Sequence, residues 1–333
     1  MLPYTRQQES ILAFTGTALV GLAALCWGLA GGIGGLLISH GWDPLLIAFS
    51  RGATGLLCVT LWLAVRRRDS GLKDFRLWAW SSLAGLGVAG NFGFYFTSIE
   101  YGSVAVAATL MYCAPLFVYL VSFAAGLEKP TAVKLSALPV VVLGIVLLTQ
   151  VDEVGANSVS AASVGTGLLS GLSYAVFIFS FKSASYRGSP QAILAIAFAA
   201  LSMVTFVLLW PNGSGQIVWA ASSADWPWFA TLGILGAGLS FVLYVIGLNH
   251  TSPTVASVTA MLEPVTATLF AVLVLNEGLD MSQLIGMSLI LLAVTALSSY
   301  SARAKPGVRY KDPVSHTGRH PAHHHYHWAH QGH

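Results

Sequence analysis

Ten long apolar runs follow one another through almost the whole chain, and they restrict the fold more than any other feature. A helix needs about 20 mostly apolar residues to cross the ~30 Å hydrocarbon core of a bilayer. Because unpaired backbone groups are costly in lipid, each run is expected to be a helix. The sequence therefore predicts an all-α integral membrane protein with ten transmembrane helices. These helices are expected at residues 12–38, 44–65, 77–98, 103–125, 131–150, 164–182, 190–210, 227–247, 254–275 and 282–300.

The composition agrees with a membrane protein and argues against a water-soluble domain. Hydrophobic residues make up 55% of the 333 residues and charged residues only 9%, whereas soluble domains average about 25% charged residues. The sequence has no P-loop, GxSxG or HExxH motif, and its connections are too short for an ATPase domain. We therefore predict no enzyme activity, no cofactor, no metal site and no nucleic-acid partner. Energy for moving a solute would have to come from a gradient.

Basic residues fall on one side of the predicted topology and so set its orientation. Cytoplasmic segments of membrane proteins carry an excess of Lys and Arg. All 16 basic residues here except Arg51, which lies inside the second span, fall in the predicted cytoplasmic segments or at the cytoplasmic ends of spans. No basic residue occurs in the segments predicted on the other side, which are 39–43, 99–102, 151–163, 211–226 and 276–281. We expect a multi-pass protein of the cell (inner) membrane, in contact with membrane lipid, with both termini cytoplasmic.

The two halves of the chain are related by an internal repeat with an offset of 149 residues, the spacing between Pro115 and Pro264. Identical pairs at this offset include Gly87/Gly236, Phe92/Phe241, Tyr95/Tyr244, Pro115/Pro264 and Glu128/Glu277. Five helices in each copy place the second copy upside down, which is typical of secondary transporters with a substrate site at the repeat interface. We expect residues 1–150 to form the first five-helix repeat, 151–300 the second, inverted repeat, and 301–333 a His-rich cytoplasmic tail.

Two charged residues, Arg51 and Glu263, are predicted inside the membrane, where a charge at a helix centre costs about 2.5–3.5 kcal/mol. Arg51 lies about seven residues into the second run and Glu263 about nine residues into the ninth, so their expected depths differ by about 6 Å. We expect both to face a central cavity. A Glu263 side chain without a partner would favour its neutral form and could bind a proton or a cationic group. If Arg51 pairs with it, the two form a structural latch instead.

Aromatic and polar side chains at similar depth complete the candidate site. These residues are Trp27, Asn91, Tyr95, Tyr112 and Tyr174. Aromatic rings with polar ends can line a pocket for an amphipathic or cationic solute through stacking or cation–π contacts.

Pro115 and Pro264 are expected to kink the fourth and ninth helices. Each proline lacks a backbone N–H, so the carbonyl groups of Met111 and Ala260 should lose their usual helix partners. Such a kink is tolerated where a helix lines a cavity. A packing kink without ligand contact is the alternative.

These features resemble the EamA-type transporters of the drug/metabolite transporter superfamily. The resemblance covers residues 12–149 and 164–299, and it is carried by Trp27-Gly28, by CAPLFVYLVSFAAGLEKP at 113–130 and by LEPVTATLFAVLVLNEGL at 262–279. It implies a ten-helix inverted repeat with cytoplasmic termini. It also implies transport of small metabolites, most often the export of amino acids.

The leading prediction is a secondary exporter, such as an antiporter, of amino acids or similar small metabolites that works by alternating access. Its substrate-binding residues would be Trp27, Arg51, Asn91, Tyr95, Tyr112, Tyr174 and Glu263, with Glu263 also the candidate for proton coupling. One alternative is proton-coupled uptake of an organic cation such as a choline-like solute. Others are an intramembrane enzyme and a non-transporting sensor or scaffold built on the His-rich tail, since His-rich tracts can bind transition metals.

Overall fold

Helices make up the regular structure of the computed structural model, which describes residues 6–65, 70–151, 160–274 and 278–303. Only the backbone is described at 6–10, 211–219, 221 and 301–303, and the predicted tail beyond Arg303 lies outside the described residues. No strand occurs in the described ranges. The helices are α1 (Arg6–Ser39), α2 (Pro44–Val65), α3 (Phe75–Glu100), α4 (Val104–Met111), α5 (Ala114–Ala124), α6 (Ala132–Thr149), α7 (Ala161–Ser185), α8 (Pro190–Ser222), α9 (Trp226–Gly233), the π-helix η3 (Ile234–Leu239), α10 (Ser240–Leu248), α11 (Pro253–Thr259), α12 (Leu262–Val274) and α13 (Met281–Arg303).

Nine helical segments in the described part of the chain are long and apolar enough to cross a membrane, so the chain is a multi-pass membrane protein. They coincide with nine of the ten predicted runs. The remaining run, 77–98, lies within α3, a helix of 26 residues that is not among the nine. Four glycines and Asn91 make this helix less apolar than the others.

α8 is longer than the sequence predicted. Its backbone continues through most of the connection expected at 211–226 and ends at Ser222. The Pro, Asn and Gly residues at 211–215 predicted the end of a helix. The apolar residues that follow at 217–220 instead extend the same helix.

Two of the membrane spans are each divided into two helices, α4 with α5 and α11 with α12. The interruptions fall just before Pro115 and Pro264, which lie in the first turns of α5 and α12. A proline in the first turn of a helix removes no hydrogen bond, because that N–H has no partner within the helix. The Ala260 carbonyl loses its usual partner, because Pro264 has no N–H, but it is not left free, since it accepts a hydrogen bond from the backbone N–H of Glu263 at 2.9 Å.

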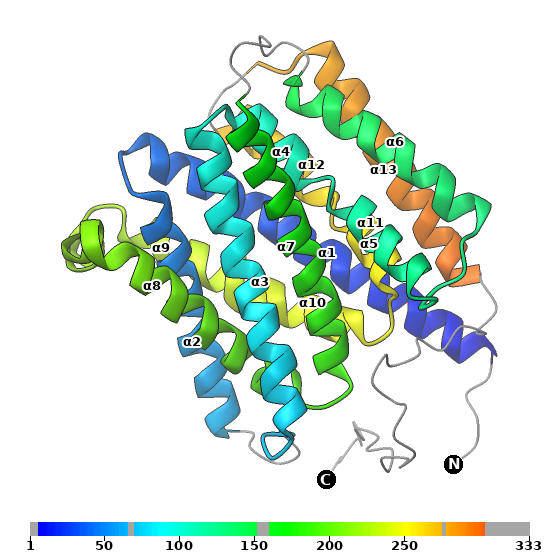
Figure 1. Ribbon diagram of the computed structural model, residues 1–333, viewed down its shortest axis with the longest axis horizontal. Coiled ribbons are helices and arrows are strands. Elements are labelled where there is room, and N and C mark those ends of the chain that lie inside the picture. Colours follow the sequence, from blue (N-terminus) through cyan, green and yellow to red (C-terminus); the bar gives the residue numbers. More distant parts are fainter. Residues whose placement is uncertain (1–5, 66–69, 152–159, 275–277, 304–333) are drawn as a thin grey trace.

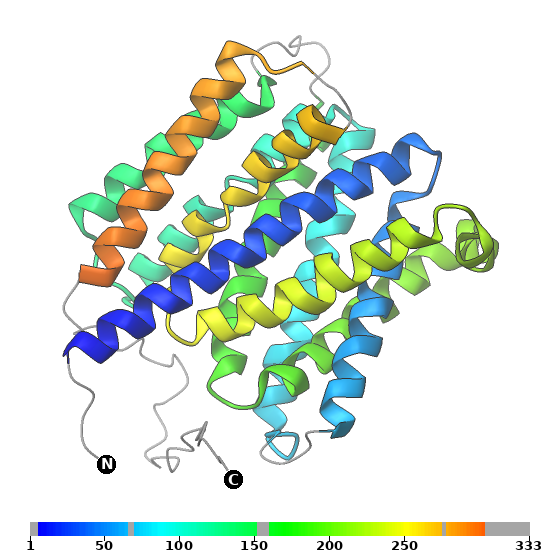
Figure 2. The ribbon, with the colours of Figure 1, turned by 180° about the vertical axis from the view of Figure 1, so that it is seen from behind.

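The helices are arranged around a long central pair, α3 and α7 (Figure 1). α8 also packs against α3, and α2 lies along α8. On the opposite face α1 crosses the molecule between α12 and α10 (Figure 2). The largest hydrophobic core extends through both halves of the chain, and its largest contributions come from α7 and α8.

α6 and α13 pair with each other along one edge of the molecule, as both views show (Figures 1 and 2). Their backbones approach closely where Gly144 faces Gly286. A Cβ atom on Gly286 would lie 2.6 Å from the Gly144 carbonyl oxygen, and one on Gly144 would lie 2.8 Å from Cγ1 of Ile290. Small residues at a crossing allow such close packing in membranes.

A buried charged cluster connects the turn after α5 to the start of α11. The Glu128 side chain is 4% exposed and forms an ion pair with Lys134. Its carboxylate also accepts hydrogen bonds from the backbone N–H of Thr254, at 3.2 Å, and from the Thr254 hydroxyl group. Since Glu128 and Thr254 lie in different halves of the sequence, this cluster ties the two halves together.

Lys182 is buried next to this cluster, although the sequence predicted it at a cytoplasmic end of a span. It lies in the last turn of α7 and is 4% exposed. Its ammonium group donates to the carbonyl oxygens of Leu248, of Asn249 at 3.4 Å and of Thr251 at 3.1 Å. A buried ammonium group needs such acceptors. Lys182 therefore holds the turn between α10 and α11.

The turn between α1 and α2 contacts the start of α9 through Asp225. The indole N–H of Trp42 donates to Asp225 Oδ2 at 2.7 Å, and the His40 ring nitrogen Nδ1 lies 3.0 Å from Asp225 Oδ1. The hydrogen bond from Trp42 holds the pKa of Asp225 below its usual range, and the contact with His40 lowers this pKa further.

Candidate functional site

A small cavity lies between helices from both halves of the chain, and five of the seven predicted substrate-binding residues line it. Its volume is about 20 Å³, which is enough for about one water molecule. It is far smaller than ligand pockets, which span roughly 300–1,000 Å³, so it has no room for a metabolite in this conformation. The lining residues are Trp27, Arg51, Val88, Asn91, Phe92, Tyr174, Phe177, Phe241 and Glu263.

The other two predicted residues, Tyr95 and Tyr112, do not line this cavity. Tyr95 is half-buried on α3, and its ring lies 5.6 Å from the ring of the adjacent Phe96. Tyr112 is buried in the interruption between α4 and α5.

Arg51 projects from α2, where a backbone carbonyl and two aromatic rings surround its guanidinium group. Its Nε–H donates to the carbonyl oxygen of Gly236 in η3 at 2.8 Å. The central carbon of the guanidinium lies 5.2 Å from the Phe92 ring centroid and 6.0 Å from that of Phe241. Both distances lie within the range of cation–π attraction. Among the described residues, no carboxylate lies within 4.0 Å of this positive charge.

Glu263 lies in the first turn of α12, where the helix dipole favours a negative charge. Its carboxylate accepts a hydrogen bond from the Tyr174 hydroxyl group at 3.4 Å, which is long for a bond of this type. No ion pair within 4.0 Å joins Glu263 to Arg51 in the part of the chain that the structure describes. The latch considered for these residues is therefore not formed in this conformation.

Trp27 forms the aromatic wall of the cavity on the α1 side. It is 3% exposed, and its ring centroid lies 5.0 Å from that of Phe241, 4.9 Å from Tyr244 and 6.4 Å from Phe177. Its indole nitrogen has no hydrogen-bond partner among the described residues. The N–H group is therefore a buried donor that lacks an acceptor from this part of the chain in this conformation.

Gly28, next to Trp27, brings α1 against the backbone of α12. A Cβ atom at this position would collide with the carbonyl oxygen of Glu263 and lie 2.5 Å from Cβ of Thr266. Only glycine permits this approach, so the Trp27-Gly28 pair fixes the distance between the cavity wall and Glu263.

Asn91 faces the cavity, but its amide is occupied in joining α3 to α7. The amide nitrogen donates to the backbone carbonyl of Ser170 at 3.2 Å and to its hydroxyl oxygen at 3.0 Å. The Ser170 hydroxyl in turn donates to the Asn91 backbone carbonyl at 2.9 Å. Asn91 thus fixes two helices that line the cavity.

The sequence did not single out the apolar part of the lining, Val88, Phe92, Phe177 and Phe241. Apolar residues in a membrane span look alike whether they face a cavity, another helix or lipid. One signal was available for Phe92 and Phe241, because they are identical residues at equivalent positions of the repeat.

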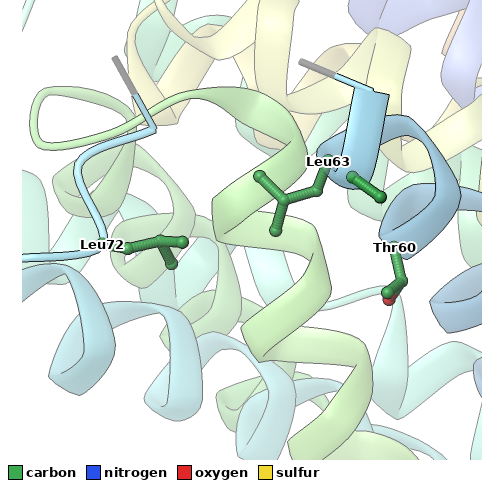
Figure 3. A pocket seen from close by; sticks show the side chains of 4 residues that line it. Thr60, Leu63 and Leu72 are labelled. Carbon is green, nitrogen blue, oxygen red and sulfur yellow. The ribbon is translucent and has the colours of Figure 1, made fainter. Parts of the chain in front are cut away.

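A larger hollow lies near the end of α2, away from these charges. Its volume is about 290 Å³, and Thr60, Leu63, Ala64 and Leu72 line it (Figure 3). None of these side chains is ionisable, and only Thr60 is polar. The smaller cavity, with two opposite charges, is therefore the candidate site.

Comparison with known proteins identifies relatives along nearly the whole chain. Residues 14–150 and 162–299 each match the EamA-like transporter family. An uncharacterized transporter of Archaeoglobus fulgidus is 31% identical over 284 residues, which cover 84% of this chain and 94% of the relative. The uncharacterized transporter YwfM of Bacillus subtilis is 24% identical over 293 residues, which cover 85% of this chain and 94% of YwfM. One solved crystal structure shares the fold with a TM-score of 0.69 at 19% identity, covering 90% of this chain and 99% of that chain.

Proposed function

The chain belongs to the EamA-like transporter family, and on this basis we propose that it is a secondary transporter that exports amino acids or similar small metabolites by alternating access. The observation that carries the proposal is that Arg51 and Glu263 line one cavity without pairing with each other. The cavity also has aromatic walls, which suit the apolar part of such a solute.

The proposed architecture has ten membrane-spanning helices in two inverted repeats, 1–150 and 151–300. The protein would lie in the cell (inner) membrane with both termini in the cytoplasm. Nine apolar helical segments support this count, with α3 proposed as the tenth crossing. The two interrupted spans support the repeat, because both breaks precede prolines at equivalent positions. In both views α13 ends beside the start of α1, as an even number of crossings requires (Figures 1 and 2).

The proposed substrate class follows from the separated charges of the site. An amino acid carries a carboxylate and an ammonium group on one carbon atom, and the guanidinium of Arg51 and the carboxylate of Glu263 complement these two charges. When the substrate leaves, Glu263 can take up a proton instead, which would couple export to the proton gradient. The small cavity must widen on one side and then on the other for this exchange.

Counterflow in proteoliposomes tests the function directly. Vesicles loaded with unlabelled amino acids should accumulate labelled amino acid from outside, while vesicles loaded with choline should not accumulate labelled choline. Movement of choline alone would replace the proposal by uptake of an organic cation. Vesicles sorted by protein orientation should then establish the direction of transport.

The coupling role of Glu263 is tested by Glu263→Gln, with Glu100→Gln at an exposed position of α3 as the matched control. We expect the first variant to lose the pH dependence of transport and the second to keep it. If Glu263→Gln retains a normal pH dependence, protons are coupled elsewhere.

Deletion of residues 306–333 should leave transport unchanged, and loss of transport would favour a role for the His-rich tail.

A further inference from the structure

We propose that Gly236 and the paired rings of Phe92 and Phe241 are positioning residues that hold the Arg51 guanidinium apart from Glu263 and direct its terminal nitrogens to an anionic group of the substrate. This inference rests on the proposed function and specifies which part of the substrate the site recognises. Four structural observations carry it.

The first observation concerns the π-helix η3, which interrupts the span between α9 and α10. Single π-helical turns inside α-helices occur frequently at functional sites. Here the turn presents the carbonyl oxygen of Gly236 to Nε of Arg51 at 2.8 Å. A guanidinium group has five N–H donors, so this bond uses one and leaves the four on the terminal nitrogens.

The second observation is that Gly236 has no room for a side chain. An added Cβ atom would lie 2.6 Å from Cβ of Ala30 and 3.2 Å from Nε of Arg51. Any larger residue would therefore push against both α1 and the arginine. Gly238, two residues later in the same turn, has its nearest neighbouring atoms at 3.6 Å, on Cys58.

The third observation concerns the rings that flank Arg51. Phe92 on α3 and Phe241 on α10 both lie within cation–π distance of its guanidinium carbon. They are equivalent residues of the two repeats, as are Gly87 and Gly236. Arg51 therefore lies between corresponding parts of the two halves, at the interface where an inverted-repeat transporter binds its substrate.

The fourth observation is the absence of an ion pair between Arg51 and Glu263 in the described residues, although both line a cavity of about 20 Å³. Opposite charges this close would attract each other strongly in a medium of low dielectric. The hydrogen bond to the Gly236 carbonyl and the cation–π contacts with the two rings compete with this attraction for the Arg51 guanidinium. The terminal nitrogens then remain for a carboxylate, which arginine binds through two parallel hydrogen bonds.

The test uses three variants of the full chain in detergent micelles or proteoliposomes. Gly236→Ala displaces Arg51 but also collides with Ala30. The double variant Ala30→Gly with Gly236→Ala removes the collision with α1 and leaves the tight contact with Arg51, at 3.2 Å from Nε. Gly238→Ala is the matched control, because it adds the same methyl group to the same π-helix where there is space.

Two measurements separate positioning from general damage. The first is the exchange rate of the Arg51 Nε–H proton with water, observed by NMR of ¹⁵N-arginine-labelled protein and assigned with Arg51→Lys. The second is equilibrium binding of L-phenylalanine relative to L-phenylalaninamide, which lacks the carboxylate. Wild-type protein and Gly238→Ala should show slow exchange and prefer the amino acid.

We expect faster exchange in the double variant, together with at least a tenfold loss of preference for the amino acid, as the loss of a hydrogen bond to a charged group implies. Unchanged exchange would refute the role of Gly236. Faster exchange with the preference retained would refute recognition of the carboxylate by Arg51. If wild-type protein moves no amino acid in counterflow but the exchange result holds, the proposed function fails and the positioning of Arg51 stands.

Discussion

The contact between Glu128 and Thr254 should contribute measurably to stability, because it is a buried hydrogen bond to a charged group between the two halves of the chain. Thr254→Val removes the hydroxyl donor and keeps the shape of the side chain. Glu128→Gln keeps the size of the acceptor but removes its charge. The double variant completes a cycle that isolates the interaction between the two side chains.

The expected magnitudes follow from burial and from the number of contacts. Thr254→Val should lower the free energy of unfolding by about 1.5–3 kcal/mol, the contribution of a hydrogen bond to a charged group. Glu128→Gln also leaves Lys134, whose side chain is 13% exposed, without its ion-pair partner. Loss of one member of a buried pair costs about 3–5 kcal/mol. Because Thr254→Val removes this hydrogen bond and Glu128→Gln weakens it, the double variant should lose about 1–2 kcal/mol less than the two single losses together.

Unfolding by denaturant in mixed micelles provides the assay, with Glu100→Gln as the control at an exposed site. The control should leave the free energy of unfolding within about 0.5 kcal/mol of the wild-type value. A coupling between Glu128 and Thr254 below about 0.5 kcal/mol would refute the reasoning. In that case the backbone N–H of Thr254 and Lys134 would be sufficient partners for the carboxylate.

Two further predictions concern the ends and edges of the fold. Gly144→Ala should lower stability by about 1–3 kcal/mol, because the added methyl group would overpack the contact with α13 at Gly286. The loss would be measured as a lower thermal midpoint. Gly165→Ala is the control and should not lower the midpoint, because no atom lies within 4 Å of a Cβ at that position. Trp42→Phe should raise the pKa of Asp225 towards its ordinary value, because it removes the main cause of the lowered pKa. A group whose pKa is lowered in the folded state stabilises the protein above about pH 4, and this stabilisation is lost as the pH falls through the folded pKa. The variant should therefore lose less stability than the wild-type protein when the pH is lowered. An Asp225 titration that is the same in both proteins, followed by ¹³C NMR of carboxylates, would contradict this assignment.

The sequence predicted the membrane-spanning helices well because the bilayer imposes a simple condition of length and apolarity. Nine predicted runs coincide with apolar helical segments of the structure. α8 was the main exception, since turn-forming residues near 211–215 did not end the helix. Helix interruptions were also only partly visible, because proline marks two of them but nothing in the sequence marks the π-helix η3.

The charged part of the candidate site could be found from the sequence, but its surroundings could not. Arg51 and Glu263 stand out because a charge inside a span is costly. Phe177 carries no such mark, since its contact with the cavity depends on how α7 is rotated. Likewise the sequence could not show that the Asn91 amide is engaged with Ser170, because these residues are 79 positions apart.

The contact of Gly28 with α12 limits how the specificity of this site can change. Backbone atoms of α1 and α12 meet at Gly28, and no mutation can trim these atoms to change the spacing of the two helices. Room for a bulkier solute must therefore come from side chains that line the cavity, such as Val88 on α3 and Phe177 on α7. Relatives that carry solutes of other sizes should therefore differ at these two positions while retaining the glycine.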